Sequence, residues 1–482
     1  MAEGKLISKI LLFEITTDQL SFNRVMKTFL VISMLMLNSC ICCAQKASFK
    51  SLGCNEQPGY FSNGKSRISY ERLKSKPSNP SGPAYINVGA EIRYQYFYFK
   101  NEDWGEEAPD PDGFVLSRFL THVDLHAGKQ FRGFLQLQSS LANGQPKTPS
   151  PVDNNQLEIH QAFADILLPV SDQKLLTFRI GRQELSYGSQ RLVAVREGPN
   201  NRQSFDGLKL NFTAPNRKFD LLYSQYVKAE PGIFDDRIHK GIRLWGSYNV
   251  FTNVPWVNNF DLYYLGLYKK TTAFNAGRGE ETRHSIGTRV WKSSGPWQYD
   301  NEAIYQFGRF SGQRVSAWTM SMHLSYTFLE KKFTPQLGLK SEFVSGDRHA
   351  ADGQLNTFNP LFPKGAYFGL AALIGPSNLV DTHPYIQLAF SEKLSFGVDY
   401  DLFWRMQRED GLYAVNGKLI YAAEAGTSKR IGQQLGTSIE YTPNKFLYFR
   451  QELTWFNSGE FLKQAGPGKD ILMLGTTITL KF

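Results

Sequence analysis

Cysteine is scarce in this 482-residue sequence, which holds only four. Cys40, Cys42 and Cys43 fall within one apolar stretch near the N-terminus, so Cys54 stands alone in the rest of the chain. A single thiol excludes a disulfide framework and a cysteine-ligated zinc site. Phosphate-binding loops and the HExxH zinc motif are also missing. We therefore expect no catalytic centre, no metal and no cofactor.

The apolar stretch itself is too short to form a retained transmembrane helix. It follows Lys27, reads FLVISMLML, and gives way to small residues before Ala44. This order is typical of a cleaved signal peptide, which we assign to residues 26–44. Residues 1–25 carry mixed charge and are interpreted as an upstream extension from a mis-assigned start. The alternative is a lipoprotein signal with acylation at Cys40, because Leu37-Asn38-Ser39-Cys40 resembles a lipobox.

Composition changes once after the signal. Residues 45–83 are rich in Ser, Lys, Asn, Gly and Pro, which predicts a flexible periplasmic tail. Residues 84–482 show no further change in composition and are interpreted as one domain. The net charge of +10 suits nucleic acid, an anionic lipid surface or an acidic solute. Export from the cytoplasm disfavours nucleic acid as the partner.

Apolar and polar residues alternate along this domain with a period of two. In LSFGVDYDLFWRM, which begins at Leu394, apolar Phe396 and Val398 alternate with polar Ser395 and Asp399. Aromatic residues make up 14% of the chain, which favours strands over helices. A helix has a period of 3.6 residues and would scramble these two sets. The sequence therefore predicts an all-β fold.

Two β architectures give this alternation, a soluble sandwich and a membrane barrel. The predicted strands span about 10–15 residues, whereas globular strands average about 5–6. The last strand ends on the aromatic residue Phe482, a feature that resembles the assembly signal of bacterial outer-membrane proteins. We predict a transmembrane antiparallel β-barrel of the outer-membrane type, with about eighteen strands beginning near residue 84 and both termini periplasmic. A barrel of this size encloses an aqueous lumen.

One connection is unusually basic. Residues 183–203 have no helical periodicity, and four arginines lie in or beside them: Arg182, Arg191, Arg196 and Arg202. A loop this long is usually functional or disordered. It can fold inward and form an anion-selective constriction, because arginine binds carboxylates through two parallel hydrogen bonds. The alternative is an outward loop whose charges contact lipopolysaccharide.

Two segments resemble the alginate export family of outer-membrane barrels. The first contains Arg182-Gln183, Tyr187-Gly188, Arg191-Leu192 and Phe205-Asp206-Gly207-Leu208. The second contains Ser345-Gly346-Asp347 and the run NTFNPLFPKGAYFG at 356–369. The resemblance covers roughly residues 84–482. It implies an eighteen-stranded barrel whose electropositive lumen passes a polyuronate and is gated by loops.

The resemblance also implies which residues act. As selectivity residues it favours the four arginines Arg182, Arg191, Arg196 and Arg202. Strand parity adds the lumen-facing candidates Arg118, Lys209, Arg405 and Arg450. The acids Glu184, Glu197 and Asp206 are expected to hold the arginines in place by ion pairs. For any single basic residue, a structural pair or a rim charge is the open alternative.

We therefore predict an outer-membrane channel for passive export or diffusion of an anionic, alginate-like polysaccharide. The alternatives are a general anion-selective or oligosaccharide porin and a non-conducting structural barrel. An enzyme is not expected, because neighbours such as His284 and Ser285 point to opposite faces of a strand. The expected partners are outer-membrane lipid, lipopolysaccharide and a periplasmic protein, and the expected state is a monomer. The substrate and the direction of flux stay open.

Overall fold

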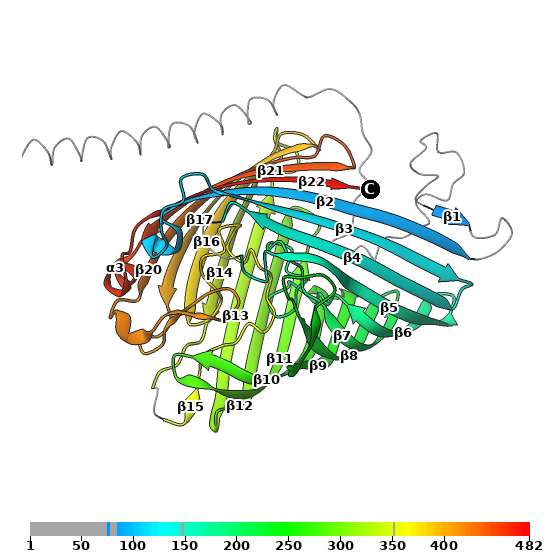
Figure 1. Ribbon diagram of the computed structural model, residues 1–482, viewed down its shortest axis with the longest axis horizontal. Helices are drawn as coiled ribbons and strands as arrows, with labels where there is room; N and C mark the ends of the chain where they lie inside the picture. The colour runs from blue at the N-terminus through cyan, green and yellow to red at the C-terminus, as the bar shows by residue number, and fades with distance from the viewer. Residues whose placement is uncertain (1–74, 78–83, 146–148, 350–351) are drawn as a thin grey trace, which may run out of the picture.

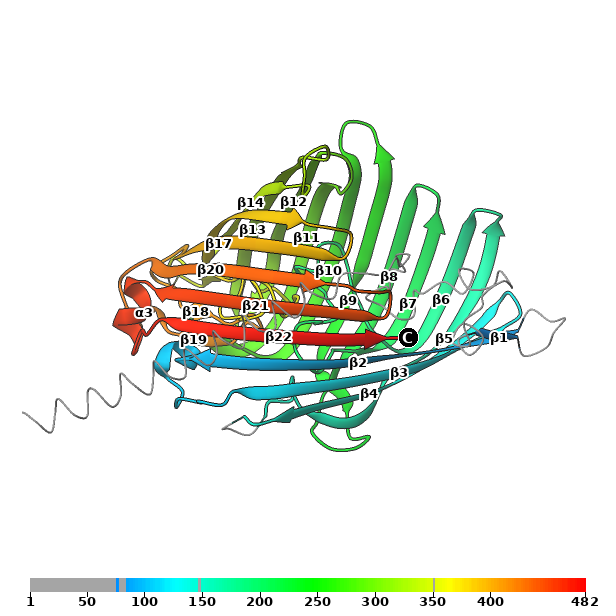
Figure 2. The same cartoon turned by 90° about the horizontal axis from the view of Figure 1, so that it is seen from above.

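A closed β-barrel accounts for most of the chain (Figures 1 and 2). The computed structural model describes residues 75–77 and 84–482, except 146–148 and 350–351. Within this part, eighteen antiparallel strands form the ring, and the first pairs with the last from Glu91↔Lys481 to Lys100↔Leu472. Across the described residues, no helix has the length and apolar character needed to cross a membrane. The predicted upstream extension, the signal peptide and most of the predicted tail lie outside the described residues.

The barrel strands follow one another around the ring in chain order. They are β2 (Tyr85–Lys100), β3 (Phe114–Ala127), β4 (Phe131–Asn143), β5 (Asn155–Ser171), β6 (Lys174–Gln183), β7 (Phe205–Ala214), β8 (Arg217–Lys228), β9 (Arg237–Val254), β10 (Asn258–Phe274), β11 (Gly277–Lys292), β12 (Trp297–Phe310), β13 (Gln313–Thr327), β14 (Gln336–Val344), β16 (Leu379–Ala389), β17 (Leu394–Arg405), β20 (Arg430–Tyr441), β21 (Leu447–Ser458) and β22 (Ile471–Lys481). Short strand β1 (Ser75–Pro77) pairs with β2, and β15 (Gln354–Leu355) pairs with β13 in parallel. The predicted barrel and its strand number are confirmed.

The alternation in the sequence becomes two faces of the barrel wall. On β13, Met320, Met322 and Leu324 are 46%, 46% and 50% exposed on the outside. Ser321 and Ser325 have the opposite parity on the same strand and are buried on the inside. An apolar outer face and a polar inner face are the arrangement that a lipid bilayer requires of a barrel.

The two ends of the barrel differ in the length of their connections. At one end the turns are short, such as residues 128–130 and 215–216. At the other end three connections are long, residues 184–204, 345–378 and 406–429. Outer-membrane barrels have short periplasmic turns and long extracellular loops. The start of β2 and the end of β22 therefore lie at the periplasmic end, as predicted.

The extracellular end also holds the small elements of the chain. These are η3 (Glu102–Gly105), β18 (Leu412–Tyr413), β19 (Leu419–Tyr421), η4 (Ala423–Ala425) and α3 (Glu460–Ala465). Trp104, Phe461 and Leu462 are almost fully buried there, and they join one apolar cluster with Phe403 and Phe456 from the barrel strands. The elements therefore pack down onto the barrel instead of extending away from it.

Two of the long connections fold into the lumen. We call residues 184–204 the first inner loop and residues 345–378 the second inner loop. They meet in a parallel bridge, in which Ala194 N donates to Phe362 O at 2.9 Å and Phe362 N donates to Leu192 O at 2.8 Å. Val193 is 0% exposed and Phe362 is 4% exposed, so the bridge lies in a packed apolar core inside the barrel.

Candidate functional site

The first inner loop crosses the lumen from one wall to the opposite wall. Near its start, Arg191 contacts β12 and β14, with Nε 3.1 Å from Glu302 Oε2 and Nη1 3.0 Å from Glu342 Oε1. Farther along, Glu197 forms an ion pair with Arg118 on β3. Strands β3 and β12 are half the ring apart in the strand order. The loop is therefore a bar across the pore, and the inward alternative predicted for residues 183–203 describes its position.

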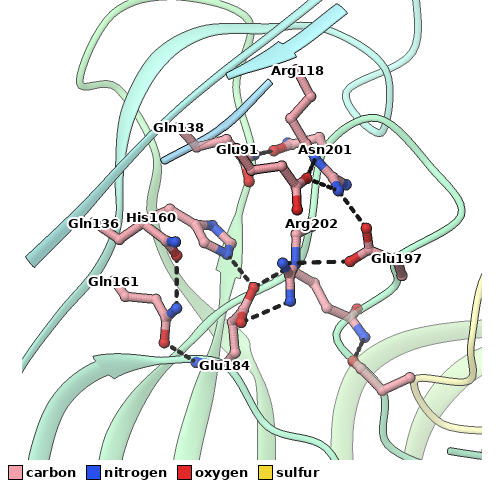
Figure 3. Close-up of polar contacts among 12 residues, drawn as sticks. Glu91, Arg118, Gln136, Gln138, His160, Gln161, Glu184, Glu197, Asn201 and Arg202 are labelled. Carbon is pink, nitrogen blue, oxygen red and sulfur yellow. Dashed lines mark hydrogen bonds and ion pairs between the residues drawn. The ribbon is translucent and has the colours of Figure 1, made fainter. Parts of the chain in front are cut away.

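An ion-pair cluster fastens the loop to the wall formed by β2 and β3 (Figure 3). Arg118 is 1% exposed, and its Nε lies 3.1 Å from Glu91 Oε1. Glu197 pairs with the same guanidinium, and Arg93 donates to Glu197 O at 2.7 Å. Burial acts to raise the pKa of Glu197, but Arg118 and Arg202 lower it to about 2. Glu197 thus stays ionised over the physiological range and holds the loop.

A second part of the cluster lies around Arg202 at the end of the loop. Arg202 Nε is 2.7 Å from Glu184 Oε1, and Arg202 Nη1 is 3.4 Å from Glu197 Oε2. His160 Nε2 on β5 is 2.8 Å from the same Glu184 oxygen (Figure 3). Glu184, Arg202 and His160 are 3%, 6% and 4% exposed. Burial lowers the pKa of Arg202, but Glu184 and Glu197 outweigh it and the pKa is raised. The pairing expected for Glu184 and Glu197 is present.

The backbone of the first inner loop turns tightly near its start. Gly188 has φ +54, and a Cβ built on it would lie 2.2 Å from Tyr248 Oη. Any larger residue would clash there and would also need a left-handed conformation. The neighbouring Tyr187 stacks on Tyr248 with ring centroids 5.1 Å apart. The Tyr187-Gly188 pair thus shapes the start of the loop against β9.

Arg182 does not face the lumen. It lies on the same face of β6 as Phe178 and Ile180, which are 36% and 52% exposed on the lipid side. Its Nε is 2.9 Å from Asp206 Oδ1, and the two residues are register partners on β6 and β7. Strand parity therefore corrects the expected pore position of Arg182, although its predicted pair with Asp206 is present.

The four candidates chosen by parity all lie on the inner face, but they have partners there. Besides Arg118, Lys209 Nζ is 3.3 Å from Asp220 Oδ2, and Arg450 pairs with Glu452 and lies 3.4 Å from Glu440. Arg405 is 1% exposed and donates to the carbonyls of Gly426 and Ser428, each at 2.7 Å. Its guanidinium also stacks over Phe461 at 3.8 Å. Arg405 thus supports the extracellular loops and is shielded from a passing solute.

Three other cations lie beside the inner loops, and their charges are available to bind a solute. Arg196, Lys269 and Lys364 are half-buried, and among the described residues none of them forms an ion pair with a carboxylate. Lys269 Nζ on β10 lies 5.5 Å from the ring centre of Phe362. Lys364 Nζ lies 5.2 Å from the ring centre of Tyr367, and a Cβ on Gly365 would lie 3.3 Å from Arg196 Cγ. We call these three residues the inner cations.

The charge state of Lys364 is poised close to neutral pH. Burial, together with the positive charges of Arg191 and Lys340, lowers the pKa of Lys364 to about 8. The ammonium group is therefore protonated near pH 7 and loses its charge in mildly alkaline solution. Since Lys364 belongs to the second inner loop, its protonation changes the charge where the two loops meet.

Sequence reasoning found Arg196 but not Lys269 or Lys364. Lys364 lies inside the run 356–369 that carried the family resemblance. The sequence therefore shows the residue, but it does not show that the residue has no acidic partner. Lys269 has the parity of the inward residue Leu267 on β10 and was open to the reasoning applied to Lys209. The absence of an acidic partner for these cations depends on contacts between distant segments and leaves no local signal.

A closed barrel with an apolar outer face, a charged lumen and inward loops defines an outer-membrane channel protein. The family model described as alginate export matches residues 84–470. The chain belongs to the alginate export family. The predicted family and the bacterial outer-membrane location are both confirmed.

Solved structures of Pseudomonas aeruginosa porins share the fold. OccD3 (OpdP) has a TM-score of 0.55 at 12% identity, covering 85% of this chain and 93% of that one. OpdK, solved with vanillate, has a TM-score of 0.54 at 10% identity, covering 82% and 98%. OccK2 (OpdF), solved in complex with glucuronate, has a TM-score of 0.52 at 10% identity, covering 82% and 96%. No curated protein matches the chain.

Proposed function

We propose that this outer-membrane channel passively conducts an anionic polysaccharide, an alginate-like polyuronate or its fragments. The observation that supports the proposal is the set of inner cations, Arg196, Lys269 and Lys364, which lie beside the inner loops and form no ion pair within the described part of the chain. A carboxylate that reaches this region can pair with a cation without displacing an acid. In a narrow lumen with low-dielectric walls the fields of several cations add, which raises the local concentration of anions.

The paired arginines have a different part in this proposal. Arg191, Arg202 and Arg118 bind acids of the loop and the wall, so their charges are largely balanced. They hold the bar across the pore, and the inner cations attract the solute. The lumen is then selective through a few unpaired charges, in place of the ring of arginines expected from the sequence.

A second candidate, a porin for small organic anions, follows from how tightly the inner loops pack. Val193, Ala194 and Leu355 are 0% exposed, so the loops fill part of the lumen as a core does. The glucuronate and vanillate in the related barrels of OccK2 and OpdK are small carboxylates. Chain length separates the two candidates, because only the polyuronate channel passes long oligomers.

Carboxylated oligosaccharides should block the channel far more strongly than neutral ones. In planar bilayers at low salt, oligouronates should reduce single-channel current at a concentration about tenfold below that needed with maltooligosaccharides of equal length, because anions dwell beside the inner cations. Translocation of long oligouronates into a sealed vesicle would favour the polyuronate channel over the small-anion porin. Equal block by neutral and charged sugars would contradict both.

Selectivity should also depend on pH through Lys364. Its pKa of about 8 means that the residue is charged at pH 7 and largely neutral at pH 9.5. The anion preference, read from the reversal potential in a salt gradient, should therefore weaken as pH rises through about 8. The Lys364→Arg variant keeps its charge and should keep its anion preference at pH 9.5. The same pH dependence in both proteins would show that another group is responsible.

The remaining parts of the proposal concern partners and processing. We infer that the channel works as a monomer surrounded by lipopolysaccharide, has no catalytic activity, and receives its substrate from a periplasmic protein. The signal peptide at 26–44 and the tail at 45–83 remain predictions, as does acylation at Cys40 as the alternative to cleavage.

A further inference from the structure

Two acids and a histidine converge on the inner face of the barrel near its extracellular end. Asp381 and His383 lie on β16, and Asp401 lies opposite them on the neighbouring strand β17. They are 2%, 7% and 0% exposed. One donor atom of each residue lies within 4.8 Å of the donor atoms of the other two. Asp381 is also the register partner of Glu342 on β14, which pairs with Arg191 of the first inner loop.

Each of the three side chains has a buried polar atom without a hydrogen bond. Within the described residues these atoms are Asp381 Oδ1, His383 Nε2 and Asp401 Oδ1. Asp401 Oδ1 does contact His383 Nδ1 as an ion pair, but not with hydrogen-bond geometry. Buried polar atoms are satisfied in most proteins, so three such atoms in one cluster indicate that a ligand is shared among them.

The surroundings fit a bound ion. Gln434 Nε2 donates to Asp401 Oδ2 at 2.8 Å, which orients this carboxylate and leaves Oδ1 available. Such outer contacts commonly fix the ligands of a metal. Asp381 and His383 also line a cavity of about 160 Å³, so the cluster opens toward water on one side. A site with three protein ligands and one open side can hold a water or a solute oxygen in the remaining position.

We propose that Asp381, His383 and Asp401 bind one divalent transition-metal ion, with Zn²⁺ as the best fit. One imidazole nitrogen and two carboxylate oxygens are ligands of the borderline type that zinc accepts, whereas calcium and magnesium prefer oxygen alone. Zinc binds such nitrogen and oxygen ligands at about 2.0–2.2 Å. The proposal does not depend on which solute the channel conducts.

The competing arrangement is a metal-free ion pair. In that case a protonated His383 would balance the two carboxylates and a third, Asp399, whose Oδ1 lies 3.7 Å from His383 Nε2. Lys340, the register partner of His383 on β14, would assist it. Lys340 Nζ lies 4.9 Å from the ring centre of Tyr385, and no ion pair joins it to a carboxylate among the described residues. Metal titration separates the two arrangements, because a cluster already balanced by a protonated His383 is not expected to bind Zn²⁺.

The test uses the full chain, folded in detergent and stripped with a chelator, and isothermal titration with ZnCl₂. We expect one equivalent to bind, with the affinity reduced about tenfold or more in His383→Ala and in the milder variant Asp401→Asn. The matched control is His323→Ala, since His323 lines the same cavity but bonds to Tyr385 Oη through Nε2 at 2.8 Å. Its affinity should equal that of the wild type. A heat-dependent shift on electrophoresis verifies that each variant is folded.

Co²⁺ absorption identifies the ligands. Nitrogen and oxygen ligands give only weak d–d bands, whereas a cysteine ligand adds an intense charge-transfer band. All four cysteines lie outside the described residues, at 40, 42, 43 and 54. We expect d–d bands without the charge-transfer band, and their loss in His383→Ala. No stoichiometric binding by the folded wild type, a thiolate band, or unchanged binding in His383→Ala would each overturn the proposal.

Discussion

Replacing residues 186–202 with a short Asn-Gly turn should raise the single-channel conductance several-fold. The first inner loop is a bar between opposite walls, fixed by Arg191 on Glu302 and by Glu197 on Arg118. A barrel of eighteen strands has a lumen too wide for its own side chains to fill, so the loop sets the narrowest cross-section. The replacement is geometrically simple, because Gln183 and Phe205 are register partners at the ends of β6 and β7.

The matched control replaces the β8–β9 connection, residues 229–236, with the same turn. Its residues are exposed or half-buried at the extracellular end, and the described chain shows none of them in the core cluster inside the barrel. This control should conduct like the wild type. If removing residues 186–202 left the conductance unchanged while the protein remained folded, the first inner loop would not obstruct the path of ions.

The fold could be read from the sequence because the relevant signals are local. Alternation places Met320 and Met322 outward and Ser321 inward, and the same rule orients the other barrel strands except where a bulge interrupts them, as at His160 and Gln161. The long basic connection between β6 and β7 was also visible, as were the acids Glu184 and Glu197 that bind its arginines. These features depend on neighbours within the strand or within one loop.

The sequence does not predict in the same way which cations of the site lack an ion-pair partner. Arg191 cannot bind a solute freely because it pairs with Glu302 and Glu342. These acids lie more than a hundred positions away in the sequence, on strands of the opposite wall. Arg182 faces outward because β6 continues its alternation to Gln183, two residues beyond Gly181, instead of ending at the glycine. Which cations stay unpaired is a property of the closed ring, and it becomes visible only when all the strands are in place.

Arg191 and Arg202 are poor targets for testing selectivity. Removing one partner of a buried ion pair commonly costs about 3–5 kcal/mol, because the other charge is left buried and unpaired. Substituting Arg202 would leave Glu184, which is 3% exposed, with His160 as its neighbour and no arginine. A change in conductance would then report on a displaced loop as much as on a lost charge.

The inner cations allow a cleaner substitution, and its effect should be large. In Arg196→Gln/Lys269→Gln/Lys364→Gln, no carboxylate loses an ion-pair partner in the described part of the chain, so the loop should stay in place. The acids that remain in this region keep their own partners, since Arg191 still binds Glu302 and Glu342. We therefore expect most of the anion preference to be lost, with the change shrinking as the Debye length falls from about 10 Å at 0.1 M salt to about 3 Å at 1 M.

A second triple variant controls for net charge. Lys174, Lys218 and Lys331 are exposed at the periplasmic turns, and their replacement with glutamine removes the same formal charge from the protein. Exposed charges at that distance from the inner loops are screened by salt. This variant should keep the anion preference and the oligouronate block of the wild type.

The reversal potential in a KCl gradient is the most direct measurement of the central claim, which is that unpaired cations beside the inner loops select anions. At 0.1 M salt and pH 7, the wild type and the periplasmic-turn variant should show the sign of an anion-selective pore. The variant lacking Arg196, Lys269 and Lys364 should show a reversal potential close to zero, with a conductance close to that of the wild type. A cation-selective wild type, or an inner-cation variant with unchanged reversal potential, would contradict the account.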